Sequence, residues 1–476
     1  MATAIAAAAL PAASETLGEA ILAAYQTNPT LQAQRAALRA LDETYVQARA
    51  GYNPSANAAA TITTNTNNNP GGFTQPLPGQ SQPLVPGDTQ TSGVAVVLTQ
   101  PLYTGGRVAA QVGEAQAQIL AGREQLRATE QSVLGQVVLA YADVLRDQEE
   151  VAVLEADHDV LQHALAETRA RTEVGELTRT DLALVDARIA AADAQLAQVR
   201  SQYQNSRAEF AQVVGHPPAT LAPPATIDDR LPTSLETALT MARDAPAVRQ
   251  AVFTEQASFA KIAEAKAARR PTLALQGVAG YSGGALGLHW PFAHYTYDLS
   301  ASAVLSTPLF TGGLTSSQIR QAAETNAADR INIEGARRLS QFQVAEVWDA
   351  LTAARVGVTA NQAQVAASSL AFRGMVEESR DGDRSVFDAM LAQQSYSAAQ
   401  IALVAAQHDA FVAGAALLAD LGRLDVTIFA PEVKPYDPRV NFDRVRHAWP
   451  FAPWSGAIAD VDRIGALTID HGPGDR

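Results

Sequence analysis

The 476-residue chain contains no cysteine, which excludes disulfide scaffolds, thiolate zinc sites and cysteine nucleophiles. Aromatic residues make up only 6% of the chain, and charged residues make up 18%. Alanine dominates the apolar residues and buries little area per residue, so a thick compact core is not expected. The composition favours an elongated, thin-walled body.

Basic residues are also scarce. Lysine occurs only at positions 261, 266 and 434, and the formal net charge is −14. Because no basic stripe is available to neutralise phosphates, nucleic acid is not an expected partner. The sequence has no phosphate-binding glycine loop, zinc-protease motif or hydrolase nucleophile motif, and its histidines lack metal-ligand spacing. We therefore expect no enzyme activity, no cofactor and no metal site.

A run of about 18 apolar residues, as a transmembrane helix requires, is missing as well. Residues 1–14 (MATAIAAAALPAAS) resemble the apolar end of a signal peptide with small residues for cleavage, although a basic n-region is absent. A disordered alanine-rich tail is the alternative. If residues 1–14 are the remnant of an export signal, the protein leaves the cytoplasm.

An internal repeat organises the rest of the chain. Leu98–Gly106 (LTQPLYTGG) recurs as Leu305–Gly313 (LSTPLFTGG), an offset of 207 residues (305 − 98). The same offset relates Tyr141 to Trp348, Gly175 to Gly382, Asp181 to Asp388 and Gly215 to Gly422. We interpret the chain as a tandem duplication, with copies at residues 15–215 and 234–422 and a proline-rich linker at 216–233. Residues 423–476 form a C-terminal segment that we expect to be disordered beyond about residue 450.

Long helices are predicted in both copies, because residues 102–216 and 309–430 contain no proline. An apolar ladder with a period of seven runs from Val112 to Leu161, and a second one runs from Leu351 to Phe372. This period is typical of helices that pack side by side in coiled coils. Residues 107–173 alone would form a helix about 100 Å long. Shorter helices are expected at residues 17–49 and 235–269.

Two strand-like runs lie between the short and the long helix of each copy. In residues 295–306 apolar side chains alternate with Thr, Asp and Ser, which predicts one apolar and one polar face. Such strands are typical of outer-membrane barrels, and an amphipathic sheet on a soluble core is the alternative. Residues 67–91 are rich in Asn, Gly and Pro and favour a solvent-facing loop. Four strands cannot close a barrel and lipid does not tolerate an open edge, so we expect chains to share one barrel, with three chains supplying twelve strands.

The duplication, the element order and the paired Pro-Leu-Tyr/Phe-Thr-Gly-Gly junctions resemble the TolC family of outer-membrane efflux and secretion channels. The resemblance covers roughly residues 15–422. It implies a mainly α protein with membrane β-strands, in which each copy has the order helix, strand, strand, long helix, helix. It further implies a homotrimer whose 12-stranded barrel in the outer membrane continues into an α-helical barrel in the periplasm. The implied partners are outer-membrane lipid, a periplasmic adaptor protein and an inner-membrane ABC or RND transporter.

The resemblance also assigns roles to the turns that follow the two long helices. It implies that Thr180 and Asp181 tie neighbouring helices shut, that Arg384 is their arginine partner, and that Asp388 forms an acidic ring at the periplasmic gate. The tips that bind the adaptor are implied to comprise Gly175, Glu176, Leu177, Gly382, Asp383 and Arg384. Two departures are Ser379, where some members have a tyrosine, and Leu391, where they have a second acidic ring. The residues themselves also fit a purely structural role, because Thr178 with Asp181 and Ser385 with Asp388 have the spacing of helix capping boxes.

The expected function is that of an exit duct in a tripartite export system. Type I protein secretion is favoured because the segment Tyr436–Arg439 (YDPR), with Asn441, Phe442, Val445 and Trp449, is similar to the branches associated with it. A small-molecule or multidrug efflux channel is the first alternative. A soluble coiled-coil structural protein, suggested by the heptads and the acidic composition, is the second.

Overall fold

The computed structural model describes residues 14–66, 88–286, 295–381, 383–448 and 452–464. The expected export signal and most of the loop at 67–91 lie outside these residues. The chain divides into two compact units. The first comprises Met1–Leu38, Ala121–Val252 and Asn332–Pro438, and the second comprises Arg39–Leu120, Phe253–Ile331 and Arg439–Arg476.

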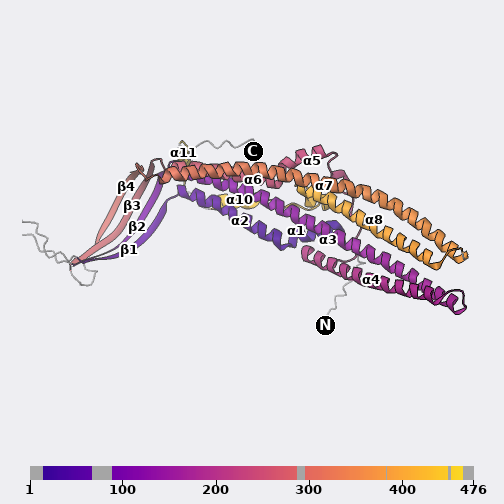
Figure 1. Ribbon diagram of the computed structural model, residues 1–476. Coiled ribbons are helices and arrows are strands. Elements are labelled where there is room, and N and C mark those ends of the chain that lie inside the picture. The colour runs from indigo at the N-terminus through magenta and orange to yellow at the C-terminus, as the bar shows by residue number, and fades with distance from the viewer. Residues whose placement is uncertain (1–13, 67–87, 287–294, 382, 449–451, 465–476) are drawn as a thin grey trace, which may run out of the picture. The chain divides into compact units, whose positions relative to one another are not determined.

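The described residues contain the same series of elements twice (Figure 1). The first series is α1 (Leu17–Thr27), α2 (Pro29–Arg49), β1 (Ser55–Thr66), β2 (Asp88–Tyr103), α3 (Arg107–Glu173) and α4 (Arg179–Val214). The second is α5 (Leu235–Met241), α6 (Pro246–Ala267), β3 (Thr272–Leu286), β4 (Tyr295–Ser306), α7 (Leu314–Asp381) and α8 (Val386–Asp420). Three short helices follow, namely α9 (Val426–Phe429), α10 (Arg439–Ala448) and α11 (Ser455–Arg463). The predicted order of helix, strand, strand, long helix and helix is confirmed.

The short helix expected at the start of each copy is broken in two by a proline. A residue before proline is driven out of the helical region, and Asn28, which precedes Pro29, has ψ 123°. The Asn28 side-chain oxygen then accepts hydrogen bonds from the backbone N–H groups of Thr30 (2.9 Å) and Leu31 (3.4 Å). The second copy breaks in the same way before Pro246, where Ala245 has ψ 146°.

The period-seven ladder of α3 is its buried side. Val112, its first member, is half-buried, and Ile119, Leu126, Val133, Ala140, Leu154 and Leu161 are buried. Asp147, which interrupts the ladder, is also buried, and its carboxylate lies 2.8 Å from the Arg146 guanidinium. The α7 ladder differs, because Leu351 is buried whereas Val358, Val365 and Phe372 are half-buried.

The four strands form one antiparallel sheet in the order β1-β2-β3-β4. The register places Val96, Ala279 and Leu299 at one level on one face, with Ala58 of β1 beside them. Apolar side chains dominate this face across the sheet, which we call the apolar face; the opposite face of β4 carries Thr296, Asp298, Ser300 and Ser302. The predicted alternation is confirmed. Within the described residues, β1 and β4 are edge strands, each paired on one side only.

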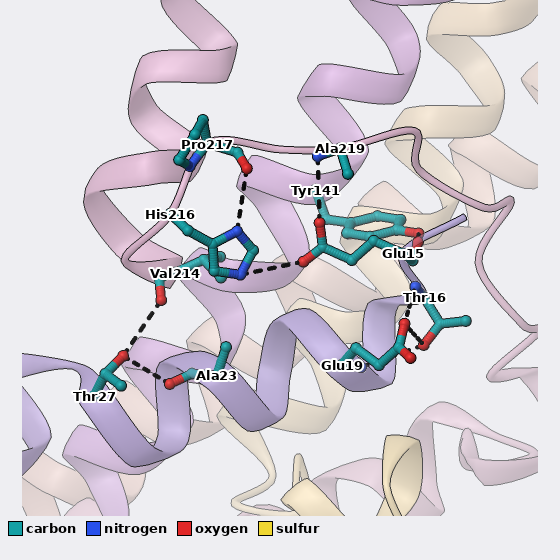
Figure 2. A network of polar contacts seen from close by, with 10 residues as sticks. All are labelled: Glu15, Thr16, Glu19, Ala23, Thr27, Tyr141, Val214, His216, Pro217 and Ala219. Carbon is teal, nitrogen blue, oxygen red and sulfur yellow. Dashed lines mark hydrogen bonds and ion pairs between the residues drawn. The ribbon is translucent and has the colours of Figure 1, made fainter. Parts of the chain in front are cut away.

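The linker between the copies is fixed to the first helix and to α3. Glu15 pairs with Leu221 in an isolated bridge, and the Tyr141 hydroxyl donates to the carbonyl oxygens of Glu15 (2.9 Å) and Ala222 (2.5 Å). His216 Nε2 lies 3.4 Å from the Glu15 carboxylate (Figure 2). Burial raises the pKa of Tyr141 to about 12, so its hydroxyl stays a proton donor at neutral pH.

Among the described helices, α8 alone is long and apolar enough to cross a membrane, by length and composition only. A further expectation needs correction. The C-terminal segment was expected to be disordered beyond residue 450, but residues 455–463 form α11. This helix has no counterpart in either copy of the repeat, so the similarity between the copies gives no signal for it.

Candidate functional site

The turn between α3 and α4 is braced by an ion pair. Gly175 adopts a left-handed conformation, φ 83°, and Glu176 N–H donates to the Arg171 carbonyl at 2.9 Å. The Arg171 Nε then lies 3.2 Å from the Glu176 carboxylate, which closes the turn onto the last turn of α3. Val174 is 72% exposed at this tip.

An ion pair also closes the turn between α7 and α8, with the acidic and the basic residue exchanged. Glu378, which corresponds to Arg171 in the repeat, accepts backbone hydrogen bonds from Asp383 (2.9 Å) and Arg384 (3.2 Å) through its carbonyl. Its carboxylate lies 3.2 Å from Arg384 Nε. The predicted tip residue Gly382 lies outside the described residues.

Both predicted capping boxes are present. Thr178 and Asp181 exchange hydrogen bonds at the start of α4, and Ser385 and Asp388 do so at the start of α8. The side-chain hydrogen bonds from Thr178 and Ser385, followed by those from the backbone, lower the pKa values of Asp181 and Asp388 below the usual range. Both carboxylates are therefore ionised at neutral pH.

The two tips of one chain lie against each other. Val185 and Ile189 of α4 pack with Leu161 of α3 and Met390 of α8 in one apolar cluster. A small hollow of about 80 Å³ beside this cluster is lined by Asp181 and Arg384, among others. The structure thus brings these two predicted gate residues to one surface, while Arg384 is ion-paired with Glu378 of its own chain. Thr180 is exposed, and Asp388 is held in its capping box.

Two polar ties between α3 and α8 were not found by sequence reasoning. Asp157 of α3 is only 4% exposed, and its Oδ1 accepts hydrogen bonds from Gln393 Nε2 (3.1 Å) and Ser397 Oγ (3.0 Å) of α8. These residues fall on different copies at unrelated positions, so neither spacing nor repeat links them. A buried polar network of this kind specifies how the two helices pack.

The second tie involves His408 of α8. Its Nε2 lies 3.0 Å from Asp143 of α3, which also pairs with Arg146 at 2.8 Å, and its Nδ1 lies 3.0 Å from Asp409. Burial disfavours the charged form of His408, but the hydrogen bonds to Asp143 and Asp409 outweigh burial and raise its pKa. The tie is therefore strongest when His408 is protonated.

A third feature that sequence reasoning missed lies in the second unit, at the junction between β2 and α3. The Asp462 carboxylate of α11 is fully buried and accepts hydrogen bonds from Thr104 N (2.8 Å), Gly106 N (3.0 Å) and Ala109 N (3.3 Å). It also accepts from the Thr104 and Tyr52 hydroxyls. A carboxylate at a helix N-terminus satisfies orphan N–H groups and is favoured by the helix dipole.

No group of three or more His, Asp or Glu side chains in the described part of the chain could hold a metal ion. The tips offer charge and exposed apolar surface.

Comparison with known proteins identifies the family of this chain. The model of the outer membrane efflux protein family matches residues 20–216 and 240–423. The chain belongs to this family. It is 32% identical to the outer membrane efflux protein BepC of Brucella suis over 441 residues, 92% of each chain. It is 23% identical to the proteases secretion protein PrtF of Dickeya chrysanthemi over 288 residues, which is 57% of this chain and 60% of that protein.

The fold of this outer membrane efflux protein matches solved structures. The crystal structure of the Campylobacter jejuni CmeC outer membrane channel superposes with a TM-score of 0.74 at 14% identity, covering 92% of this chain and 90% of that chain. The predicted family, location and general function are confirmed: the protein is an outer-membrane export channel whose helical part extends into the periplasm.

Proposed function

We propose that three copies of this chain close a twelve-stranded barrel and form a passive export duct. The observation that carries the proposal is the sheet itself. It has four strands, an apolar face across its whole width and two edge strands, β1 and β4, each paired on one side only within the described residues. An open edge leaves backbone N–H and C=O groups unsatisfied in lipid, and pairing β4 with β1 of the next copy satisfies them.

The exposed surface of α7 supports the same assembly. Leu314, Phe342, Val356 and Leu370 are 62–68% exposed and are spaced by multiples of seven residues. A helix with a single partner would leave such a stripe in water, whereas a coiled-coil neighbour from another copy would bury it.

The tips are proposed to bind a periplasmic adaptor and to close the duct at rest. The residues assigned to adaptor binding are Gly175, Glu176, Leu177, Gly382, Asp383 and Arg384. Exposed apolar side chains beside them, Val174 (72%) and Phe387 (46%), provide a surface that a helical partner could cover. The duct itself does no chemistry, and an inner-membrane ABC or RND transporter supplies the energy.

Type I protein secretion is the proposed task, and its support is the similarity to PrtF, which is named as a proteases secretion protein. Small-molecule efflux is the second candidate, favoured by the longer similarity to BepC, which is named as an efflux protein. Deletion of the gene separates them. Loss of a protein from the culture medium with unchanged drug sensitivity indicates secretion, and drug sensitivity with an unchanged set of secreted proteins indicates efflux.

The proposed gate consists of Thr180, Asp181, Arg384 and Asp388. In the trimer Arg384 would contact Thr180 and Asp181 of a neighbouring helix, competing with its own Glu378. One exposed ion pair contributes about 0–1 kcal/mol, so three copies acting on one opening contribute roughly 0–3 kcal/mol.

Conductance in planar bilayers tests the gate. Arg384→Ser is expected to raise single-channel conductance, and Asp388→Ala is expected to weaken block by divalent cations without opening the pore. Arg179→Ser is the matched control, because this arginine lies exposed at the first position of α4. Unchanged conductance in Arg384→Ser together with raised conductance in Arg179→Ser would refute the gate assignment. The turn residues would then serve only as helix caps.

A further inference from the structure

The apolar face of the sheet carries an open hollow near the end of the strands that leads into the helices. Its volume is about 980 Å³, within the range of small-molecule sites. One wall is formed by the strands, with Leu98 of β2, Leu275 of β3 and Ala301 and Ala303 of β4. These side chains belong to the apolar face, as the strand register requires. The hollow is therefore a local extension of the surface that faces lipid.

The other wall of the hollow is formed by Trp454, just before α11, and by Ile458 and Val461 of α11. The helix is held from its buried side. Ile458 packs with Tyr52 and Val108, and the Asp462 carboxylate caps the start of α3. Helix α11 is thus packed into the second unit and lies against the sheet.

A polar side chain, Gln100, lies on the apolar face at the hollow, and Trp454 at the start of α11 hydrogen-bonds to it. Gln100 of β2 is only 9% exposed, and its Oε1 accepts a hydrogen bond from Trp454 Nε1 at 2.9 Å. Its Nε2 donates to the carbonyl oxygens of Tyr52 (3.0 Å) and Pro101 (2.7 Å). With its amide satisfied, Gln100 presents no unpaired polar group to the hollow.

The apolar side chains on the hollow side of α11 and at its two ends stay exposed. Trp454 is 52% exposed, Val461 48% and Ile464 84%. Tryptophan is enriched where a membrane protein meets the boundary between hydrocarbon and water, and an amphipathic helix with an exposed apolar side lies in that boundary.

We propose that α11 is an in-plane interfacial helix and that the hollow beside it binds an acyl chain of a phospholipid from the periplasmic leaflet of the outer membrane. We assign the periplasmic leaflet because the hollow lies at the ends of β2, β3 and β4 that pass into the periplasmic helices. We assign an acyl chain as the occupant because the hollow opens on the lipid-facing side of the sheet. A second copy of the chain must pair at the edge of β1 or β4, whereas the hollow lies on the face of the strands.

The proposal rests on the outer-membrane location and does not depend on cargo or gating. The test uses the full-length protein extracted in mild detergent, with bound phospholipid measured per chain by mass spectrometry. Ala301→Phe with Ala303→Phe fills the hollow, and Ala60→Phe adds the same side chain on the apolar face of β1, away from it. We expect the filled variant to retain less than half of the phospholipid that wild type and Ala60→Phe retain. Equal retention in all three proteins would overturn the proposal.

Tryptophan fluorescence provides an independent readout. Replacing Trp290, Trp348 and Trp449 by Phe leaves Trp454 as the sole tryptophan. In vesicles of brominated phosphatidylcholine, bromines near the headgroup end of the acyl chain are expected to quench Trp454 more strongly than aqueous iodide does. Quenching by iodide alone would place α11 in water, and quenching by neither would indicate that another protein segment covers it. Both results contradict the proposal. Single-channel conductance of the same samples shows whether each variant still folds and forms a duct.

Discussion

The Asp462 carboxylate provides the sharpest test of how α11 is attached. Replacing Asp462 by Ala removes the acceptor for the N–H groups of Thr104, Gly106 and Ala109 and for two hydroxyls. A buried hydrogen bond to a charged group contributes about 1.5–3 kcal/mol, and each buried donor left without an acceptor costs about 1–3 kcal/mol. The five bonds share one carboxylate and are not additive, so we expect a local loss of about 3–5 kcal/mol.

Hydrogen exchange measures this loss where it occurs. Because each 1.4 kcal/mol corresponds to a factor of ten, the amides of Gly106 and Ala109 are expected to exchange roughly 10²–10⁴ times faster in Asp462→Ala. Asp460→Ala is the matched control, since its carboxylate on the same helix is 76% exposed and lies 3.4 Å from the Arg463 guanidinium. Unchanged exchange at Gly106 and Ala109 in Asp462→Ala, or an equal effect of Asp460→Ala, would refute the reasoning.

Two further predictions concern the ties between α3 and α8. Asp157→Ala removes the acceptor of Ser397 Oγ and leaves Gln393 Nε2 only its 3.3 Å bond to Ser397 Oγ, so we expect a loss of about 1–3 kcal/mol, seen as a lower melting temperature. Asp159→Ala, on the exposed side of α3, is the control, and equal melting of both variants would contradict the prediction. The raised pKa of His408 means that its contacts with Asp143 and Asp409 stabilise the protein below the ordinary value of 6.5 and that this contribution is lost as pH rises through the raised value. Wild type should therefore lose melting temperature relative to His408→Gln on going from pH 6 to pH 8, and parallel pH profiles would exclude the tie.

The bounds of the first long helix could be predicted closely from the sequence. Residues 107–173 were expected as one helix, and α3 spans Arg107–Glu173. The absence of proline and an apolar period interrupted only at Asp147 determine such a helix locally, without help from the rest of the fold. The breaks before Pro29 and Pro246 were equally local, and the effect of proline on the preceding residue was the signal that could have found them.

The ties that depend on distant segments could not be predicted. Asp462 contacts Thr104 across more than 350 positions of sequence, and α11 has no repeat partner that would draw attention to it. The gate residues pose a different difficulty. Asp181 and Asp388 serve as helix caps whether or not they also close a duct, so one chain satisfies them without revealing contacts between copies.

Disulfide crosslinking between the edge strands tests the shared barrel most directly, because the chain has no cysteine of its own. Ala58→Cys in β1 is combined in turn with Tyr297→Cys, Leu299→Cys and Ala301→Cys in β4, three positions that sample the register between copies. A closed ring of three predicts that at least one pair gives covalent dimers and trimers and nothing larger on oxidation, while each single-cysteine variant gives no trimer. Monomers only with all three pairs, or a ladder that continues beyond the trimer, would contradict the account.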